Sequence, residues 1–184
     1  MQGQTQHAHF DNRWYKPGRN AVVRALWHLC NSFLLMSFIP GNGWRKMLLQ
    51  LFGARVGRGV VIKPRVNIKY PWNLSIGEYS WLGEGVWIDN LGLVSIGSNC
   101  CISQGAMLLC GNHNYRKTTF DLMIGNITLE NGVWIGAKGL VCPGVTCQSH
   151  AVLSAGSIAT SDLEAFKIYS GNPAVAVKDR NIEA

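Results

Sequence analysis

The stretch "LENGVWIGAKGLVCPGVTCQSHAVLSAG" (residues 129–156) decides the fold, because an aliphatic residue or a cysteine returns in it at every sixth position. The positions of this beat are Leu129, Ile135, Val141, Cys147 and Leu153. Small or apolar residues also recur four positions after beat residues, as Val133, Val145, Ala151 and Ser157. Such a period matches neither an α-helix, with about 3.6 residues per turn, nor a simple two-faced strand.

Towards the N-terminus the same beat continues with short phase slips. Its earlier members are Val56, Ile62, Ile68, Ile76, Leu82, Ile88, Ile96, Ile102 and Leu108. The period fits short strands separated by sharp turns, with three strands closing one triangular coil and successive coils about 4.8 Å apart. Glycines often follow the beat residues and accept the positive φ of such corners. The sequence therefore predicts an all-β solenoid, a parallel β-helix of about five coils.

A solenoid buries a core only by stacking its coils, so both of its ends need covers. We expect a polar tail (1–20), an N-terminal helical segment (21–53), the β-helix domain (54–163) and a C-terminal cap or tail (164–184). Within the helical segment, "AVVRALWHLCNSFLLMSFIP" (21–40) is long enough to cross a bilayer, but its first half contains Arg24, His28 and Asn31. This pattern favours an amphipathic helix that lies on a membrane surface or packs on the rest of the protein.

The beat stops at "LLCGNHNYRKTTFDLMIGN" (108–126), which predicts an excursion loop over 111–126. A coil with all its backbone groups paired offers little room for a reactive side chain, whereas an excursion can project one into a groove. His113 lies at this break, and imidazole titrates near neutrality. His113 is therefore the candidate general base.

The basic charge is concentrated in the N-terminal third of the chain. Of the 17 Lys and Arg residues, 11 lie within residues 1–70, which contain a single acid, Asp11. This asymmetry points to an anionic lipid or a phosphorylated partner for that segment. Zinc-finger, RNP and basic-zipper patterns are missing, so we predict no nucleic-acid partner.

The six cysteines form no CxxC pair, and histidines at zinc-ligand spacing are missing. Several occupy small apolar positions of the repeat, which favours buried free thiols in a reducing compartment and no metal. The first 20 residues lack the apolar core of a secretion signal. We therefore expect a cytoplasmic protein that contacts the inner face of the membrane peripherally.

The pattern of an aliphatic residue, glycine, two variable residues and a small residue resembles the hexapeptide-repeat acyltransferases, over about residues 44–178. The resemblance is sharpest at "GVWIGAKGLVCPGVT" (132–146), "LSAGSIATSD" (153–162) and "SGNPA" (170–174). "LFGARVG", "YPWNLSIGEYSWLGEGVWI" and "CGNHNY" look most like the colanic acid biosynthesis acetyltransferase branch. The resemblance implies a left-handed β-helix and a homotrimer with active sites between subunits.

The same resemblance implies an acetyltransferase that uses acetyl-CoA as co-substrate and needs no metal. The acceptor would be a hydroxyl on a sugar of an exopolysaccharide or its lipid-linked precursor, with His113 as general base. For the donor, the resemblance assigns Trp134 to a flat wall, and Ala137 and Ala155 to backbone contacts with the pantetheine arm. Thr160 and Lys178 match positions near the nucleotide.

On the acceptor side the candidate residues are Asp89, Asn90, Asn112, Asn114 and Tyr115. Asp89 and Asn90 lie roughly one coil before the excursion, where they can hydrogen-bond a sugar or the imidazole; the alternative is a turn pair at a β-helix corner. Relatives often place Pro or Asp after the histidine, whereas this chain has Asn114. The group that orients His113 is therefore not identified by the sequence.

Three alternatives remain open at this point. One is N-acetylation of an amino sugar, which sequence hardly separates from O-acetylation. Another is a non-catalytic or metal-binding β-helix protein, resembling the carbonic anhydrases of this fold; it needs converging histidines, and the coils supply His113 and His150. The third is covalent catalysis by Cys110, which has no evident partner motif.

Overall fold

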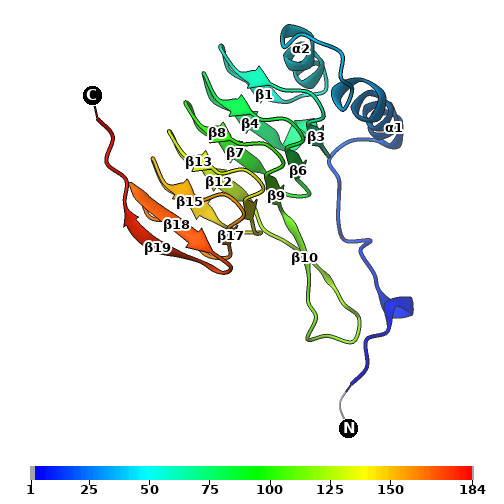
Figure 1. The fold of residues 1–184 in the computed structure, drawn as a ribbon. Helices are drawn as coiled ribbons and strands as arrows, with labels where there is room; N and C mark the ends of the chain where they lie inside the picture. Colours follow the sequence, from blue (N-terminus) through cyan, green and yellow to red (C-terminus); the bar gives the residue numbers. More distant parts are fainter. Residues whose placement is uncertain (1–2, 184) are drawn as a thin grey trace.

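The structure, a computed structural model, describes residues 3–183 and consists of a triangular solenoid whose short strands stack in three parallel sheets (Figure 1). The first sheet contains β1 (Arg55–Val56), β4 (Leu74–Ile76), β7 (Val94–Ile96), β12 (Ile127–Leu129) and β15 (Thr146–Cys147). The second contains β2 (Val61–Ile62), β5 (Trp81–Leu82), β8 (Cys101–Ile102), β13 (Trp134–Ile135), β16 (Val152–Leu153), β18 (Lys167–Gly171) and β19 (Ala174–Asp179). The third contains β3 (Asn67–Ile68), β6 (Trp87–Asp89), β9 (Met107–Leu109), β14 (Leu140–Val141) and β17 (Ile158–Ala159).

The predicted beat forms the core of this solenoid. Each beat residue is buried and pairs with its counterpart one coil later, as Val56 does with Ile76 and Ile76 with Ile96. Wherever the next beat residue follows after six positions, the residue four positions after the beat is buried as well, which fills the interior between the three sheets. The strands complete five coils, and a bridge from Cys147 to Leu163 begins a further turn. The prediction of about five coils is confirmed, with this partial sixth added.

All departures from the period lie at one corner, between the third sheet and the first, which we call the irregular corner. The spacing is eight positions, rather than six, from Ile68 to Ile76 and from Ile88 to Ile96. The excursion leaves the coil at the same corner as an antiparallel hairpin of β10 (Gly111–His113) and β11 (Leu122–Ile124), which projects from the solenoid (Figure 1). Because extra residues are confined to one corner, the other two corners stay regular.

Helices cover the N-terminal end of the solenoid (Figure 1). They are α1 (Ala21–Cys30), the π-helical turn η2 (Asn31–Leu35) and α2 (Gly43–Leu51). Two short 3-10 turns lie elsewhere in the chain: η1 (His7–His9) precedes α1, and η3 (Pro71–Asn73) connects β3 to β4. The buried Trp27 indole donates to the Ile68 carbonyl at 2.9 Å, which ties α1 to the third sheet. No helix within residues 3–183 is long and apolar enough to cross a membrane.

At the other end, the antiparallel pair β18–β19 extends the second sheet. Tyr169 on β18 is buried against the last coil, and the Gly171 amide donates to Ser157 Oγ at 3.0 Å. The Arg180 guanidinium donates to the carbonyls of Gly132 and His150. All six cysteines lie within the described residues and are free thiols, of which Cys100, Cys110 and Cys147 are buried.

Candidate active site

The hairpin of the irregular corner holds His113 in one orientation. Its Nδ1 lies 2.9 Å from the carbonyl oxygen of Phe120, and the two rings stack with centroids 4.4 Å apart. A carbonyl oxygen can only accept a hydrogen bond, so Nδ1 carries a proton, and in the neutral imidazole Nε2 is the nitrogen with the lone pair. Phe120 is thus the orienting group that the sequence did not reveal.

The hairpin turn places Phe120 in a backbone conformation that non-glycine residues rarely adopt, with φ of 50°. Asn114 builds this turn: its amide donates to the Asp121 carbonyl at 2.8 Å, and its Oδ1 accepts from the Arg116 amide at 3.1 Å. The Lys117 ammonium, 2.8 Å from the Asp121 carboxylate, closes the turn and lowers the pKa of that carboxyl. Asn114 therefore acts on His113 indirectly, through the position of Phe120.

Residues 3–19, expected as a polar tail, lie along this hairpin. The Gln6 amide donates to the Thr118 carbonyl at 2.8 Å, and the Phe10 ring lies 5.6 Å from the ring of His113. The His7 ring packs edge-on against the Phe120 ring. The Tyr15 hydroxyl donates to the Leu91 carbonyl, and the Trp72 indole donates to the Pro17 carbonyl. The N-terminal segment thus forms one wall beside the histidine, a role that its polar composition did not indicate.

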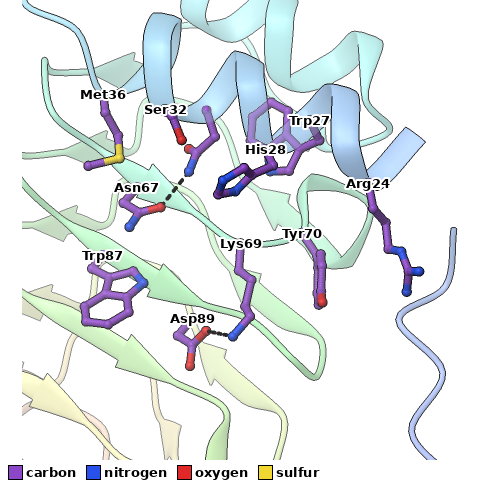
Figure 2. Close-up of a pocket in the computed structure, with 11 residues that line it drawn as sticks. Arg24, Trp27, His28, Ser32, Met36, Asn67, Lys69, Tyr70, Trp87 and Asp89 are labelled. Carbon is purple, nitrogen blue, oxygen red and sulfur yellow. Dashed lines mark hydrogen bonds and ion pairs between the residues drawn. The ribbon is translucent and has the colours of Figure 1, made fainter. Parts of the chain in front are cut away.

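Two adjoining cavities lie at this corner. One, of about 590 Å³, is lined by His113, Phe10, Tyr15 and Leu122, between the N-terminal segment and the solenoid. The other, of about 460 Å³, lies between α1 and the third sheet (Figure 2). Arg24, Lys69 and Tyr70 line both cavities, so the two adjoin, and we call them together the corner groove.

Asp89 faces this groove, whereas Asn90 does not. The Asp89 side chain is 18% exposed, and Lys69 Nζ lies 2.8 Å from its Oδ1 (Figure 2). The approach of the ammonium falls outside hydrogen-bonding geometry, so Oδ1 accepts no hydrogen bond among the described residues. Asn90 is fully buried, and its amide bonds both the backbone nitrogen and the carbonyl of Tyr70. Asn90 is therefore a structural residue of the turn at this corner, whereas Asp89 lines the groove and is placed to contact a ligand.

The other two acceptor candidates on the hairpin lie away from the groove lining. Asn112 is exposed, and its Oδ1 accepts from the His113 amide at 2.8 Å. Its side chain points to the opposite face of β10 from that of His113, because neighbouring strand residues alternate. Tyr115 is 74% exposed and lies beside the Arg116 guanidinium. Within this chain neither residue belongs to the described lining of the corner groove.

Three of the donor candidates lie together at the corner between the second and third sheets. Trp134 on β13 is 46% exposed, and its indole donates to Ser103 Oγ at 2.9 Å, which holds the ring as a flat surface. Ala137 and Ala155 follow in successive coils, joined by a 2.9 Å hydrogen bond from the Gly156 amide to the Ala137 carbonyl. Small side chains in stacked turns leave room for an extended chain to approach the backbone, so these residues fit a pantetheine arm.

The two remaining donor candidates are not brought together by the fold. Thr160 directly follows β17 of the third sheet, whereas Lys178 lies on β19 at the edge of the second sheet. Both side chains are exposed, and no hydrogen bond or ion pair joins them within residues 3–183. A shared nucleotide contact therefore requires the ligand to reach across from one sheet to the other.

Cys110 and His150 lie in surroundings that separate them from His113. Burial raises the pKa of the Cys110 thiol to about 11, so it stays protonated at neutral pH and is a poor nucleophile. His150 lies at the corner between the first and second sheets, where its ring stacks on Phe166 with centroids 4.7 Å apart. Within one chain the two histidines of the coils thus occupy different corners.

Comparisons with known proteins agree with this architecture. No protein-family model matches the chain. The chain is 39% identical over 165 residues to the "Putative colanic acid biosynthesis acetyltransferase WcaF" of Escherichia coli (strain K12), a match that covers 89% of this chain and 90% of that protein. It is 29% identical over 140 residues to the galactoside O-acetyltransferase of the same strain, covering 74% of this chain and 69% of that protein.

Among solved structures, the chain resembles the hexapeptide-repeat containing acetyltransferase of Vibrio cholerae O1 biovar eltor, complexed with acetyl coenzyme A. The TM-score is 0.78 at 18% sequence identity, and the match covers 88% of each chain. This likeness confirms the predicted fold, a left-handed parallel β-helix. It concerns the solenoid and leaves the roles of individual side chains to the geometry described above.

Proposed function

Because this chain belongs to the hexapeptide-repeat acetyltransferase family, we propose that it transfers an acetyl group from acetyl-CoA to a sugar hydroxyl, with His113 as general base. The observation that carries this proposal is the hydrogen bond between His113 Nδ1 and the Phe120 carbonyl, beside the 590 Å³ cavity. In the neutral imidazole this bond makes Nε2 the basic nitrogen, and the His113 side chain lines a space large enough for a sugar.

Acetyl-CoA supplies an acetyl group activated as a thioester. His113 Nε2 takes the proton of the acceptor hydroxyl as its oxygen bonds to the acetyl carbon and the carbon–sulfur bond breaks. The imidazolium is held by the Phe120 carbonyl during this step and then gives its proton to the departing thiolate. His113 both takes the proton from the hydroxyl and returns it to the thiolate, so the transfer needs no covalent acyl-enzyme. The protonated Cys110 thiol takes no part.

The donor would lie along Trp134, Ala137 and Ala155, with Thr160 and Lys178 near its nucleotide. The flat indole and the small residues of the regular corner support this placement. Both the basic side chain of Lys178 and the hydroxyl of Thr160 are exposed and suit phosphate oxygens.

A homotrimer with active sites between subunits is supported by the outward faces of the solenoid. The second and third sheets present exposed apolar side chains, among them Trp81, Trp87 and Trp134, with exposures of 57%, 40% and 46%. The first sheet instead presents Ser75, Ser95, Thr128 and Thr146. Apolar faces on either side of one corner suit close packing around a threefold axis, whereas the polar face suits solvent.

For the acceptor we propose a sugar of an exopolysaccharide or its lipid-linked precursor, supported by the name of the relative at 39% identity. The test is the release of free coenzyme A with a panel of neutral, amino and phosphorylated sugars. Hydroxyl sugars are expected to be acetylated. If only amino sugars react, the enzyme is an N-acetyltransferase; if no sugar reacts and acetyl-CoA does not bind, the proposal is wrong and a non-catalytic β-helix remains.

The N-terminal helices also support the proposed peripheral membrane contact on the inner face of a cytoplasmic membrane. Large apolar side chains are exposed on these helices and on the connection between them: Phe33 of η2 and Phe38 of the connection at 72% each, and Leu51 of α2 at 79%. Basic residues adjoin them: the Arg65 guanidinium lies 5.5 Å from the Phe38 ring. An apolar face with a cationic rim is suited to an anionic bilayer surface.

Replacing Phe33 and Phe38 by serine in the full chain is expected to weaken binding to phosphatidylglycerol vesicles about tenfold or more, since burying an aromatic side chain contributes about 1.5–3 kcal/mol. Vesicle flotation measures this, with pure phosphatidylcholine as the neutral reference. The control exchanges two exposed valines at the other end, Val175→Ser with Val177→Ser. Equal binding of parent and variant contradicts the membrane contact.

The ring of Phe120 is expected to contribute to catalysis by positioning His113. In Phe120→Gly the positive φ is retained at no steric cost, so the carbonyl stays in place while the stacked ring is lost. We expect kcat to fall about tenfold, because small misplacements of a catalytic group can cost up to about a hundredfold. Steady-state kinetics with acetyl-CoA saturating measures the effect. Met123→Ala, an exposed change on the same hairpin, should leave kcat unchanged; an equal loss in both variants would point to hairpin stability instead.

A further inference from the structure

We propose that the corner groove selects acceptor sugars that carry a phosphate group, which Arg24 and Lys69 hold beside the sugar presented to His113. This inference rests on the proposed acetyl transfer and adds the chemical class of the acceptor. A phosphate of this kind occurs in a nucleoside diphosphate sugar and in a polyprenyl diphosphate sugar, and both offer the same anionic group.

Two cations from different parts of the chain line the groove, on either side of Tyr70. Arg24 comes from α1, and Lys69 follows β3 at the end of the first coil; both line the cavity at His113 and the one beneath α1 (Figure 2). Arg24 makes no ion pair with any carboxylate among residues 3–183, and its side chain is only partly exposed. An arginine held half-buried without a counter-ion presents its guanidinium to a ligand that can supply one.

The charge around His113 is one-sided. The cavity at His113 is also lined by Arg13, but a bidentate contact with Asp11 neutralises that guanidinium. No Asp or Glu is among the described residues that line this cavity. Lys69 is paired with Asp89, which lines the adjoining cavity, so Arg24 is the cation of this lining without a carboxylate partner among residues 3–183, and its charge attracts an anionic sugar.

Lys69 is paired with Asp89. Its ammonium lies 2.8 Å from Asp89 Oδ1, and its side chain is 41% exposed, so N–H donors that do not face the carboxylate can reach another acceptor. Asp89 Oδ1 is buried beside this ammonium, so the carboxylate stays with Lys69. A phosphate would accept bidentate hydrogen bonds from the Arg24 guanidinium and further bonds from the open donors of Lys69.

The groove also has surfaces that suit the sugar and aglycone. Tyr70 stacks on Trp72 with ring centroids 5.1 Å apart, and Trp87 lies 40% exposed across the cavity beneath α1 (Figure 2). Burial, followed by the charges of Tyr70 and Asp89, raises the pKa of Tyr15, so its hydroxyl remains protonated. Aromatic faces and neutral hydroxyls are the usual partners of a sugar ring, and they adjoin the two cations.

The experiment compares methyl glycosides with the corresponding sugar 1-phosphates for glucose, galactose, mannose and fucose, and galacturonate as a carboxylate. For each sugar that is acetylated, kcat/KM of the 1-phosphate is expected to exceed that of the methyl glycoside about tenfold or more, as for one charge-assisted contact. In Arg24→Gln this ratio should fall close to one. The control Arg55→Gln, an exposed arginine outside the corner groove, should leave the ratio unchanged.

Each outcome separates this inference from the proposed function. If methyl glycosides and phosphates react equally well, or if Arg24→Gln retains the preference, acetyl transfer stands and the phosphate site is wrong. If galacturonate is preferred as strongly as the phosphates, the site recognises any anion and the phosphate assignment is wrong. If no sugar of either class is acetylated, the proposed function fails and this inference with it.

The two sources of the phosphate are distinguished by a second pair of acceptors. Sugars linked to uridine diphosphate and to farnesyl diphosphate are compared at equal concentration, in the presence of detergent. A preference for the polyprenyl compound supports a lipid-linked acceptor, and a preference for the uridine compound supports a nucleotide sugar. The preference for phosphate should weaken with added salt, because the corner groove is partly exposed.

Discussion

Replacing His113 by alanine should lower kcat for acetyl transfer about 10²–10⁴-fold, the usual contribution of a positioned general base. A sugar hydroxyl is too weakly acidic to attack a thioester unaided, and the remaining groups of the hairpin cannot take its proton. The Lys117 ammonium pairs with the Asp121 carboxylate and lowers the pKa of that carboxyl, which makes it a weak base, and Asn112 and Asn114 do not titrate. The loss is therefore expected in kcat rather than in acetyl-CoA binding.

The measurement is free coenzyme A release at saturating acetyl-CoA, with donor binding determined separately by calorimetry. His9→Ala is the matched control, because His9 is exposed on the N-terminal segment and lines neither cavity of the corner groove. The control should retain parental turnover. Undiminished turnover in His113→Ala would show that His113 is not the general base. Loss of acetyl-CoA binding in that variant would show that His113 binds the donor instead.

The second large effect concerns stability. Leu108→Ala is expected to lower the free energy of unfolding by about 2–5 kcal/mol, through lost apolar burial and the cavity that remains. Leu108 is fully buried and stacks between Ile88 and Val141 of the neighbouring coils, in the strand that leads to the hairpin of His113. The rigid strand ladder on both sides limits the collapse of that cavity.

Urea unfolding at one fixed protein concentration measures the change, since an oligomer's stability depends on concentration. The control is Leu93→Ala, whose side chain is 55% exposed and should change the stability by less than about 0.5 kcal/mol. Similar losses in the two variants would mean that the beat residues do not carry the core. That result would contradict the assignment of the six-residue period to stacked, buried side chains.

The corner that carries the site is partly encoded by the irregularities of the repeat. The slips after Ile68 and Ile88 and the long break after Leu108 all map to the irregular corner. The positions of these departures in the sequence identify the irregular corner as the place of the candidate site, because extra residues can be inserted only at a corner, between two strands. The number of inserted residues does not predict which side chains come into contact at this corner, because the backbone conformation of each insertion is not set by the repeat.

The group that orients His113 shows where prediction ended. Phe120 acts through a backbone carbonyl, which every residue possesses, and through a positive φ that its side chain type does not favour. Asn114, which the resemblance singled out, instead builds the turn. A contact can be predicted from residue type where a side chain makes it, as with the imidazole of His113. It cannot be predicted in this way where a backbone atom makes it, as with the carbonyl of Phe120.

The sequence by itself determined the solenoid, its core residues and the position of the candidate catalytic histidine, because a six-residue beat is a local pattern whose strands can bury apolar side chains in only one way. The tertiary structure alone decided that residues 10–17 contribute to the lining of the site, that the Asn90 amide is hydrogen-bonded to the backbone of Tyr70, and that Arg24 and Lys69 line the same cavities. These contacts join residues 20 or more positions apart, often through backbone atoms. Their geometry depends on how the helices and hairpin pack on the finished solenoid, and no local periodicity records that packing.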